Sequence, residues 1–367
     1  MSDVGDACSR RLPPVVLMVG DFNEEQAFSS EPGHAWSVIV TEVRSVCRHS
    51  EILDEVARAA DGSQDTQSLV QVMLKHHPEA GGCVEPFPVK VEIVNYLGAG
   101  DQRDALRRRL HGLLRTFNVV GIIACGTAGA VAATLEALEP LDVPVVVTLS
   151  SATHGKARQL APLQLMPNNA LQARTILATC DVILSQPETS REIHVLAAPR
   201  GDPYVDSMVR ELEALASHGG YDFKLTRVAE ADPANLGRDP NRDAQLLICV
   251  GYEDVVTKAM TIAHRFRSII LSDGCSPFTT VGPAVFRSRP SAAPAQYAVD
   301  AWSAFREVYR EYRALGGQLH PPIRLIQTIV RVRNSLEKQH YRFEGLTNVR
   351  DGFVLRREAP PLDRGET

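Results

Sequence analysis

Short apolar runs alternate with longer segments of helical period along most of this chain, and this alternation restricts the fold most strongly. The runs are almost continuously apolar, as expected of strands that are buried on both faces of a parallel sheet. Strands are expected at residues 15–20, 89–96, 119–124, 143–149, 193–198, 223–228, 246–252 and 268–272. Helices with one apolar face are expected at residues 102–117, 204–216, 296–315 and 323–338. The predicted fold class is therefore α/β.

The length of the chain indicates two domains. A chain of 367 residues is too long for one ordinary core. The strand–helix pattern pauses near residues 166–169 and changes again after Asp273, where a stretch rich in Pro and Ser leads into the last two helices. The end of the chain is polar and rich in Pro, which predicts a disordered tail.

Charge and cysteine content restrict the partners and the location. The net charge is −5, so the chain has no global attraction for nucleic acid or for an anionic membrane. No stretch approaches the roughly 20 apolar residues of a membrane span, and the apolar run at residues 15–19 is shorter than a signal-peptide core. The seven cysteines are scattered and odd in number, which favours reduced thiols. We therefore expect a cytoplasmic location, no membrane insertion and no nucleic-acid partner.

Motifs of the common catalytic classes are absent. The sequence contains no Gly-x-Ser-x-Gly, no Walker A segment, no His-Glu-x-x-His and no dinucleotide fingerprint. His76 and His77 are adjacent, so they point in different directions and indicate a solvated helix face rather than a metal site. Residues 1–14 are too short and too rich in Pro to supply a DNA-binding helix-turn-helix. We expect no catalytic residue, no metal and no cofactor.

Two polar loops follow expected strands. Residues 125–129 read CGTAG and residues 150–153 read SSAT. Both loops come at the carboxyl ends of expected parallel strands, where ligand sites of α/β proteins gather. They offer hydroxyls and backbone N–H groups, and the first opens a helix whose dipole favours an anion. Ser and Thr after a strand are also ordinary helix caps, so both roles stay open.

Residues 119–169 resemble the central block of a known family. Residues 119–155 read VVGIIACGTAGAVAATLEALEPLDVPVVVTLSSATHG, and residues 163–169 read LQLMPNN. This order of strand, small-residue loop, VPVV, Ser-Ala-Thr and Pro-containing crossover is similar to the type I periplasmic-binding-protein family, the branched-chain amino-acid receptors of ABC transporters. In that family the two loops hold the carboxylate of an α-amino acid. The resemblance implies ligand contacts from Thr127, Ala128, Ser151, Ala152 and Thr153.

Three later positions extend the resemblance. Tyr204 and Tyr252 each follow an expected strand, where the family often carries an aromatic side chain at the ligand. Asp273 follows the strand at residues 268–271, where the family carries an acidic residue that pairs with the ligand's ammonium group. Each tyrosine could equally be an aromatic residue of the core or of its rim, without a role in binding. Asp273 is also a typical turn residue before Gly274, so these alternatives stay open.

The resemblance also implies the lobes. Residues 341–347, YRFEGLT, are similar to the family's last crossover, which places crossings near residues 166–169, 285–290 and 344–347. The expected division is residues 1–167 with 289–344 as lobe 1, and 168–288 with 345–356 as lobe 2, followed by a disordered tail at 357–367. The chain departs from the family at residues 21–25, DFNEE, which replace a Gly-rich first loop, and at Val205, which replaces a Gly.

The expected function follows from the resemblance. Two Rossmann-like lobes would close on a small molecule, such as an amino acid, an amide or a small carboxylate. Lobe 1 would present the residues of the two loops, and lobe 2 would present Tyr204, Tyr252 and Asp273. A transport or signalling protein would be the partner. The alternatives are a cytosolic interaction module with a vestigial pocket and, less favoured, an enzyme with a nonstandard site.

Overall fold

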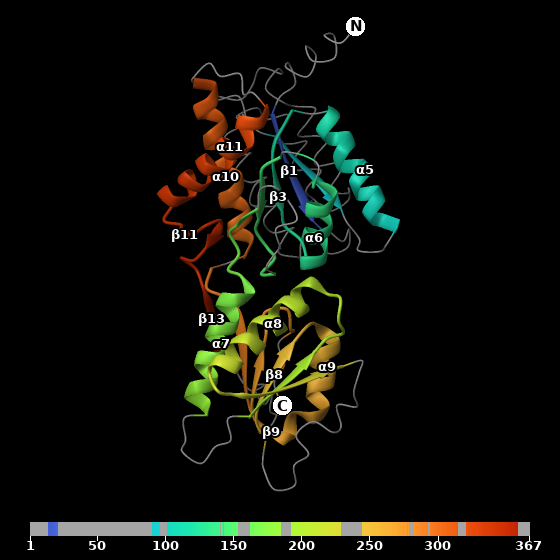
Figure 1. Ribbon diagram of the computed structural model, residues 1–367, viewed down its shortest axis with the longest axis vertical. Coiled ribbons are helices and arrows are strands. Elements are labelled where there is room, and N and C mark those ends of the chain that lie inside the picture. Colours follow the sequence, from blue (N-terminus) through green and yellow to red (C-terminus); the bar gives the residue numbers. More distant parts are fainter. Residues whose placement is uncertain are drawn as a thin grey trace, which may run out of the picture. The chain divides into compact units, whose positions relative to one another are not determined.

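The computed structural model divides the chain into two compact units, each built on its own sheet (Figure 1). Unit 1 comprises Met1–Ser150, His154–Met166 and Ala293–Arg350, and unit 2 comprises Ser151–Thr153, Pro167–Ala292 and Asp351–Thr367. The structure describes residues 14–20, 90–95, 101–116, 118–152, 162–184, 192–228, 244–292, 294–314 and 321–358, apart from positions 140, 142, 277, 279 and 281.

Unit 1 contains a seven-stranded sheet in the order β11-β12-β5-β4-β3-β1-β2. Neighbouring strands are parallel except β11 and β12. The strands are β1 (Pro14–Gly20), β2 (Lys90–Asn95), β3 (Asn118–Ala124), β4 (Val145–Val147), β5 (Leu163–Gln164), β11 (Phe343–Glu344) and β12 (Thr347–Asn348). The parallel order follows from the continuous apolar character of β1 and β3, which must be covered on both faces.

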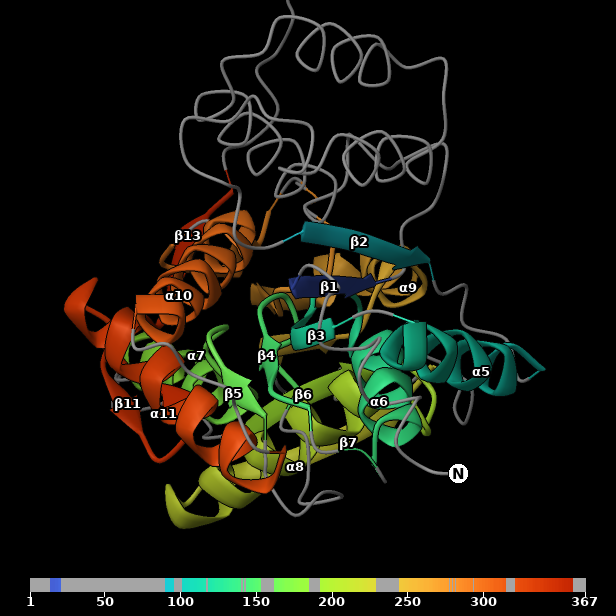
Figure 2. The same ribbon diagram turned by 90° about the horizontal axis from the view of Figure 1, so that it is seen from above.

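Helices cover both faces of the central strands β1 and β3. Figure 2 shows α5 (Asp101–Thr116) and α6 (Ala128–Ala137) on one side, and α10 (Pro294–Ala314) and α11 (Pro321–Lys338) on the other. On α5 the spacing i, i+4, i+7 buries Leu106, Leu110 and Leu113, while Arg107 and Arg109 are exposed. The sequence predicted this face of the helix.

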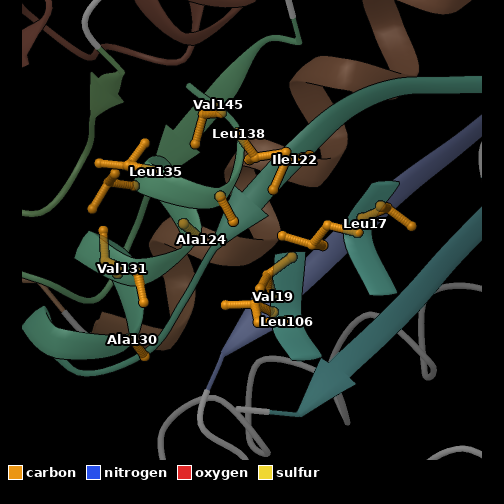
Figure 3. Packing of buried hydrophobic residues seen from close by; sticks show 14 of the residues in the cluster. Leu17, Val19, Leu106, Ile122, Ala124, Ala130, Val131, Leu135, Leu138 and Val145 are labelled. Carbon is orange, nitrogen blue, oxygen red and sulfur yellow. The ribbon is translucent and has the colours of Figure 1, made fainter. Parts of the chain in front are cut away.

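The core on the α5 and α6 side is aliphatic. Leu106 of α5 and Val131 of α6 are both buried in it, and Figure 3 shows side chains of the two helices gathered with those of the strands. The strands supply Leu17, Val19, Ile122, Ala124 and Val145. Burial of this apolar surface fixes the two helices against the strands and so holds the start of α6 at the carboxyl end of β3.

On the other face, α10 approaches β3 closely at Gly121. A Cβ atom at Gly121 would lie 2.1 Å from Cε1 of Phe305, far inside van der Waals contact. Phe305 is 2% exposed, so its ring is confined by the surrounding core. Only glycine at this position lets the ring of Phe305 lie directly on the strand.

Unit 2 contains a six-stranded sheet in the order β13-β10-β9-β8-β6-β7, parallel except for β13. Its strands are β6 (Glu192–Ala197), β7 (Asp222–Arg227), β8 (Ala244–Val250), β9 (Phe266–Leu271), β10 (Ala284–Pro290) and β13 (Phe353–Arg357). The crossovers through α8 (Pro203–His218) and α9 (Glu253–Ile262) run toward opposite edges of the sheet. Right-handed crossovers therefore place α8 and α9 on opposite faces, and α7 (Asn169–Ile183) packs against α8.

The predicted α/β class is confirmed by these two sheets. Two details of the chain differ from the prediction. The stretch at residues 284–290, expected only as a crossing, is strand β10. The expected disordered tail begins at residue 357, yet Arg357 ends β13 and the Glu358 N–H donates to the Val285 carbonyl at 2.9 Å. Pairing with β10 orders these two polar residues, and residues 359–367 lie outside the described part of the chain.

Gly121→Ala is expected to lower the free energy of unfolding by about 1–3 kcal/mol, because the new methyl group overpacks the contact with Phe305. Gly112→Ala in α5 is the matched control, since its Cβ would meet nothing within 4 Å. Gly112→Ala should raise the free energy of unfolding by about 0.5–1 kcal/mol, because alanine favours a helix more than glycine does. Urea unfolding measures both variants, and equal shifts in the two would contradict the close approach.

Candidate functional site

The candidate site of unit 2 lies where its parallel strands end. β6, β8 and β9 run in the same direction, so their carboxyl ends share one edge of the sheet. Tyr204 follows β6 in the first turn of α8, Tyr252 follows β8, and Asp273 follows β9. This edge is the usual location of ligands in open α/β sheets.

The Asp273 carboxylate accepts hydrogen bonds from three separate segments. Its Oδ1 accepts from the Tyr204 hydroxyl at 2.6 Å and from Gln172 Nε2 at 2.9 Å. Its Oδ2 accepts from the Ser151 hydroxyl at 3.2 Å. Asp273 is half-buried. The arrangement therefore holds a carboxylate in a fixed orientation with donors that are all uncharged.

Tyr204 is a donor that stays protonated. Its side chain is 4% exposed, and burial followed by the charge of Asp273 raises the pKa of Tyr204 well above its ordinary value. The same hydroxyl oxygen accepts from the Gly274 N–H at 3.2 Å. A Cβ at Gly274 would lie 2.9 Å from Cε1 of Tyr204, so glycine allows the loop after β9 to reach the tyrosine.

Gln172 is a site residue that the sequence analysis missed. It is fully buried on α7, and its Nε2 donates both to Asp273 and to the Ser288 hydroxyl at 3.1 Å. Asn169, one turn earlier, is also fully buried and donates from Nδ2 to the Tyr204 carbonyl at 3.1 Å. A signal was available, because two amides three residues apart fall on the same helix face as Ala173 and Ile176. Polar residues on the apolar face of a helix need hydrogen-bond partners.

Tyr252 lies beside Tyr204 but has a different partner. The ring centroids of the two tyrosines are 5.8 Å apart. The Tyr252 hydroxyl lies 3.3 Å from Oδ2 of Asp202, the N-cap residue of α8, whose Oδ1 accepts from the Tyr204 N–H at 2.9 Å. The two rings thus lie side by side, with Tyr204 bonded to Asp273 and Tyr252 bonded to Asp202.

The SSAT loop belongs to unit 2. Ser151 and Ala152 are buried, and the Ser151 carbonyl accepts from the Asn169 N–H at 2.7 Å. The structure therefore groups them with Asp273 rather than with the lobe of the CGTAG loop, to which the resemblance assigned them. Thr153 lies outside the described residues.

Thr127 and Ala128 are part of unit 1. Thr127 is the N-cap of α6, and its hydroxyl oxygen accepts from the Ala130 N–H at 3.4 Å. This is the capping role that the sequence analysis weighed against ligand binding. Ala128 is the first residue of α6 and is buried. A ligand role for either residue stays a prediction.

Neither a metal site nor a membrane span is found in the described part of the chain. No group of three or more His, Cys, Asp or Glu side chains there is arranged to hold a metal ion. Among the described helices, none is both long enough and apolar enough to cross a membrane. The candidate site is therefore characterised by its carboxylate, its neutral donors and its two tyrosines.

Comparison with known proteins gives matches at the level of structure. No family model matches the sequence, and no curated protein sequence matches it. An ABC transporter substrate-binding protein from Desulfitobacterium hafniense, in complex with Leu, is similar with a TM-score of 0.55 at 10% identity, over 95% of this chain and 97% of that one. A leucine-binding protein LivK from Thermotoga maritima is similar with a TM-score of 0.51 at 12% identity, over 82% and 83%.

These matches contradict the expected cytoplasmic location, because they are substrate-binding proteins of ABC transporters and point outside the cytoplasm. The cysteines carry no information about the location, for a physical reason. In the part of the chain that the structure describes, Cys125, Cys180, Cys249 and Cys275 are buried thiols outside any disulfide. Burial raises the pKa of Cys180 to about 12 and that of Cys275 to about 11, so the reactive thiolate is rare and such thiols indicate no redox compartment.

The architecture completes the comparison. The alignments with this chain span more than four fifths of each similar structure. In this chain they include residues of both unit 1 and unit 2. In this chain each unit is a sheet of mostly parallel strands flanked by helices. The chain has the type I periplasmic-binding-protein fold.

Proposed function

We propose that the protein binds a small molecule that carries a cationic group, such as an amino acid, and that Asp273 receives this group. The observation that carries the proposal is the geometry of the Asp273 carboxylate, which is half-buried and oriented by Tyr204, Gln172 and Ser151. The complex of a similar structure with Leu supports an amino acid as the ligand class.

The charge of the site favours a cation. Hydroxyl and amide donors stabilise a carboxylate without cancelling its charge, and a half-buried carboxylate gains most from a charged partner. The donors to Asp273 also fix its position before a ligand arrives, which reduces the entropy lost on binding. An ammonium group that binds this carboxylate would form a charge-assisted hydrogen bond next to the Tyr204 hydroxyl.

The similar structures also favour binding over the alternatives. They are named as substrate-binding or leucine-binding proteins, which supports a non-catalytic role and does not favour an interaction module with a vestigial pocket. A partner protein that reads the bound state, in transport or in signalling, is part of the same proposal.

Asp273→Asn is expected to weaken binding of leucine, or of whichever amino acid in a panel binds most tightly, by about tenfold or more. The substitution keeps the shape of the side chain and removes one charge-assisted hydrogen bond, which contributes about 1.5–3 kcal/mol. Isothermal titration calorimetry measures the dissociation constant. Asp254→Asn, at an exposed carboxylate in the first turn of α9, is the control and should bind as the parent does. Unchanged affinity in Asp273→Asn would remove Asp273 from the site.

Tyr204→Phe is expected to lower the free energy of unfolding by about 1–3 kcal/mol, because the Gly274 N–H and Oδ1 of Asp273 each lose a hydrogen-bond partner. It should also weaken ligand binding, but less than Asp273→Asn does, since the charge remains. Tyr309→Phe in α10 is the control, since no hydrogen bond of its hydroxyl is found among the described residues. Thermal unfolding and titration of both variants test the role, and a Tyr204→Phe protein as stable as Tyr309→Phe would contradict it.

A further inference from the structure

The antiparallel pair β10–β13 places three arginines on one face of the unit 2 sheet. Arg287 lies directly opposite Arg356, and Arg289 lies opposite Val354. Because side chains alternate along a strand, Arg287 and Arg289 point to the same face, and Arg356 joins them from β13. Ser288, between them, bonds to Gln172 of α7, so the arginines lie on the face away from α7.

This arginine face is open to solvent at its edge. Val354 is 37% exposed, and Arg356 is exposed as well. Among the described elements, α9 lies on the same side of the sheet and makes its main strand contacts with β6 and β8. The arginine side chains on this face can therefore bind a dissolved molecule without displacement of a helix.

The charges on this face do not balance. One carboxylate, that of Glu358, contacts Nη2 of Arg289 at 3.3 Å. Arg287 donates from Nη2 to the Asp273 carbonyl at 3.4 Å, a long and neutral hydrogen bond. Buried Nε atoms of Arg287 and Arg289 have no hydrogen-bond partner among the described residues. Glu358 thus pairs directly with one of the three guanidinium groups, and the charges of Glu358 and Asp273 act more weakly on Arg287.

The crowding of like charges has an energetic cost. Like charges placed directly opposite each other across two strands destabilise the pair, as at Arg287 and Arg356. Burial, followed by the charge of Arg289, lowers the pKa of Arg287 from its ordinary value. Any group that brings negative charge between these side chains would remove part of this cost.

We propose that Arg287, Arg289 and Arg356 form a binding site for a small oxyanion, a carboxylate or phosphate group. The planar guanidinium fork donates two parallel hydrogen bonds to such a group, which makes arginine the usual residue for bidentate recognition of oxyanions. This site lies on the other face of β10 from the Gln172–Ser288 bond, and it does not depend on the proposed amino-acid binding at Asp273.

The test is titration with inorganic phosphate and, separately, with succinate, at constant ionic strength maintained with sodium chloride. Constant ionic strength is needed because exposed arginines respond to screening alone. Calorimetry gives the dissociation constant, and thermal unfolding gives an independent measure, since a ligand of the native state raises the midpoint. Phosphate binding alone, succinate binding alone, or binding of both would each support the site and identify the oxyanion group it takes. Binding of neither would overturn the proposal.

Substitution of single arginines tests whether the anion binds at this site. Arg287→Gln and Arg356→Gln should each weaken binding of the anion by about tenfold or more, because each removes a bidentate donor. Arg210→Gln, at an exposed arginine of α8, is the matched control and should bind as the parent does. Arg356 is exposed, so its variant is expected to fold even where Arg287→Gln does not. Equal weakening in Arg210→Gln, or parental affinity in Arg356→Gln, would overturn the assignment.

Discussion

The hydrogen bonds to the Asp273 carboxylate join segments that are far apart in the sequence. Tyr204 begins α8, Gln172 lies on α7, and Ser151 precedes both of them along the chain. A half-buried carboxylate is costly to leave without donors, so these three side chains are constrained together. The loop after β9, the start of α8 and one face of α7 therefore depend on a single charged group, and the candidate site has little freedom to change one member alone.

The regular elements could be predicted because their signals are local. β3 and β8 contain continuous apolar runs, and α5 and α8 carry one apolar stripe, so hydrophobic periodicity alone was enough to predict these elements. Strand β10 was not predicted, since Arg287, Ser288 and Arg289 interrupt its apolar character and Pro290 ends it. One of the two neighbours of β10 is β13, which is distant in sequence, and no local pattern reveals that pairing.

The site could be predicted only in part. Asp273 and Tyr204 were identified by their places after strands, and the structure brings them into direct contact. Gln172 was missed, because an amide in a helix usually faces solvent and only tertiary packing shows that this one is buried. Thr127 shows the reverse case, in which a hydroxyl after a strand caps its own helix. Tertiary packing decides whether a hydroxyl after a strand contacts a ligand or bonds to the backbone of its own helix.

The two hydrogen bonds of Gln172 have a consequence for how this sequence can diverge. One amide nitrogen serves Asp273 in the loop after β9 and Ser288 on β10, and the side chain is fully buried. Loss of that amide would leave a buried hydroxyl and a carboxylate oxygen each short of one donor, a combined defect larger than either alone. Relatives of this chain should therefore vary positions 172, 273 and 288 as a set, so that an apolar residue at 172 accompanies the loss of polarity at the other two.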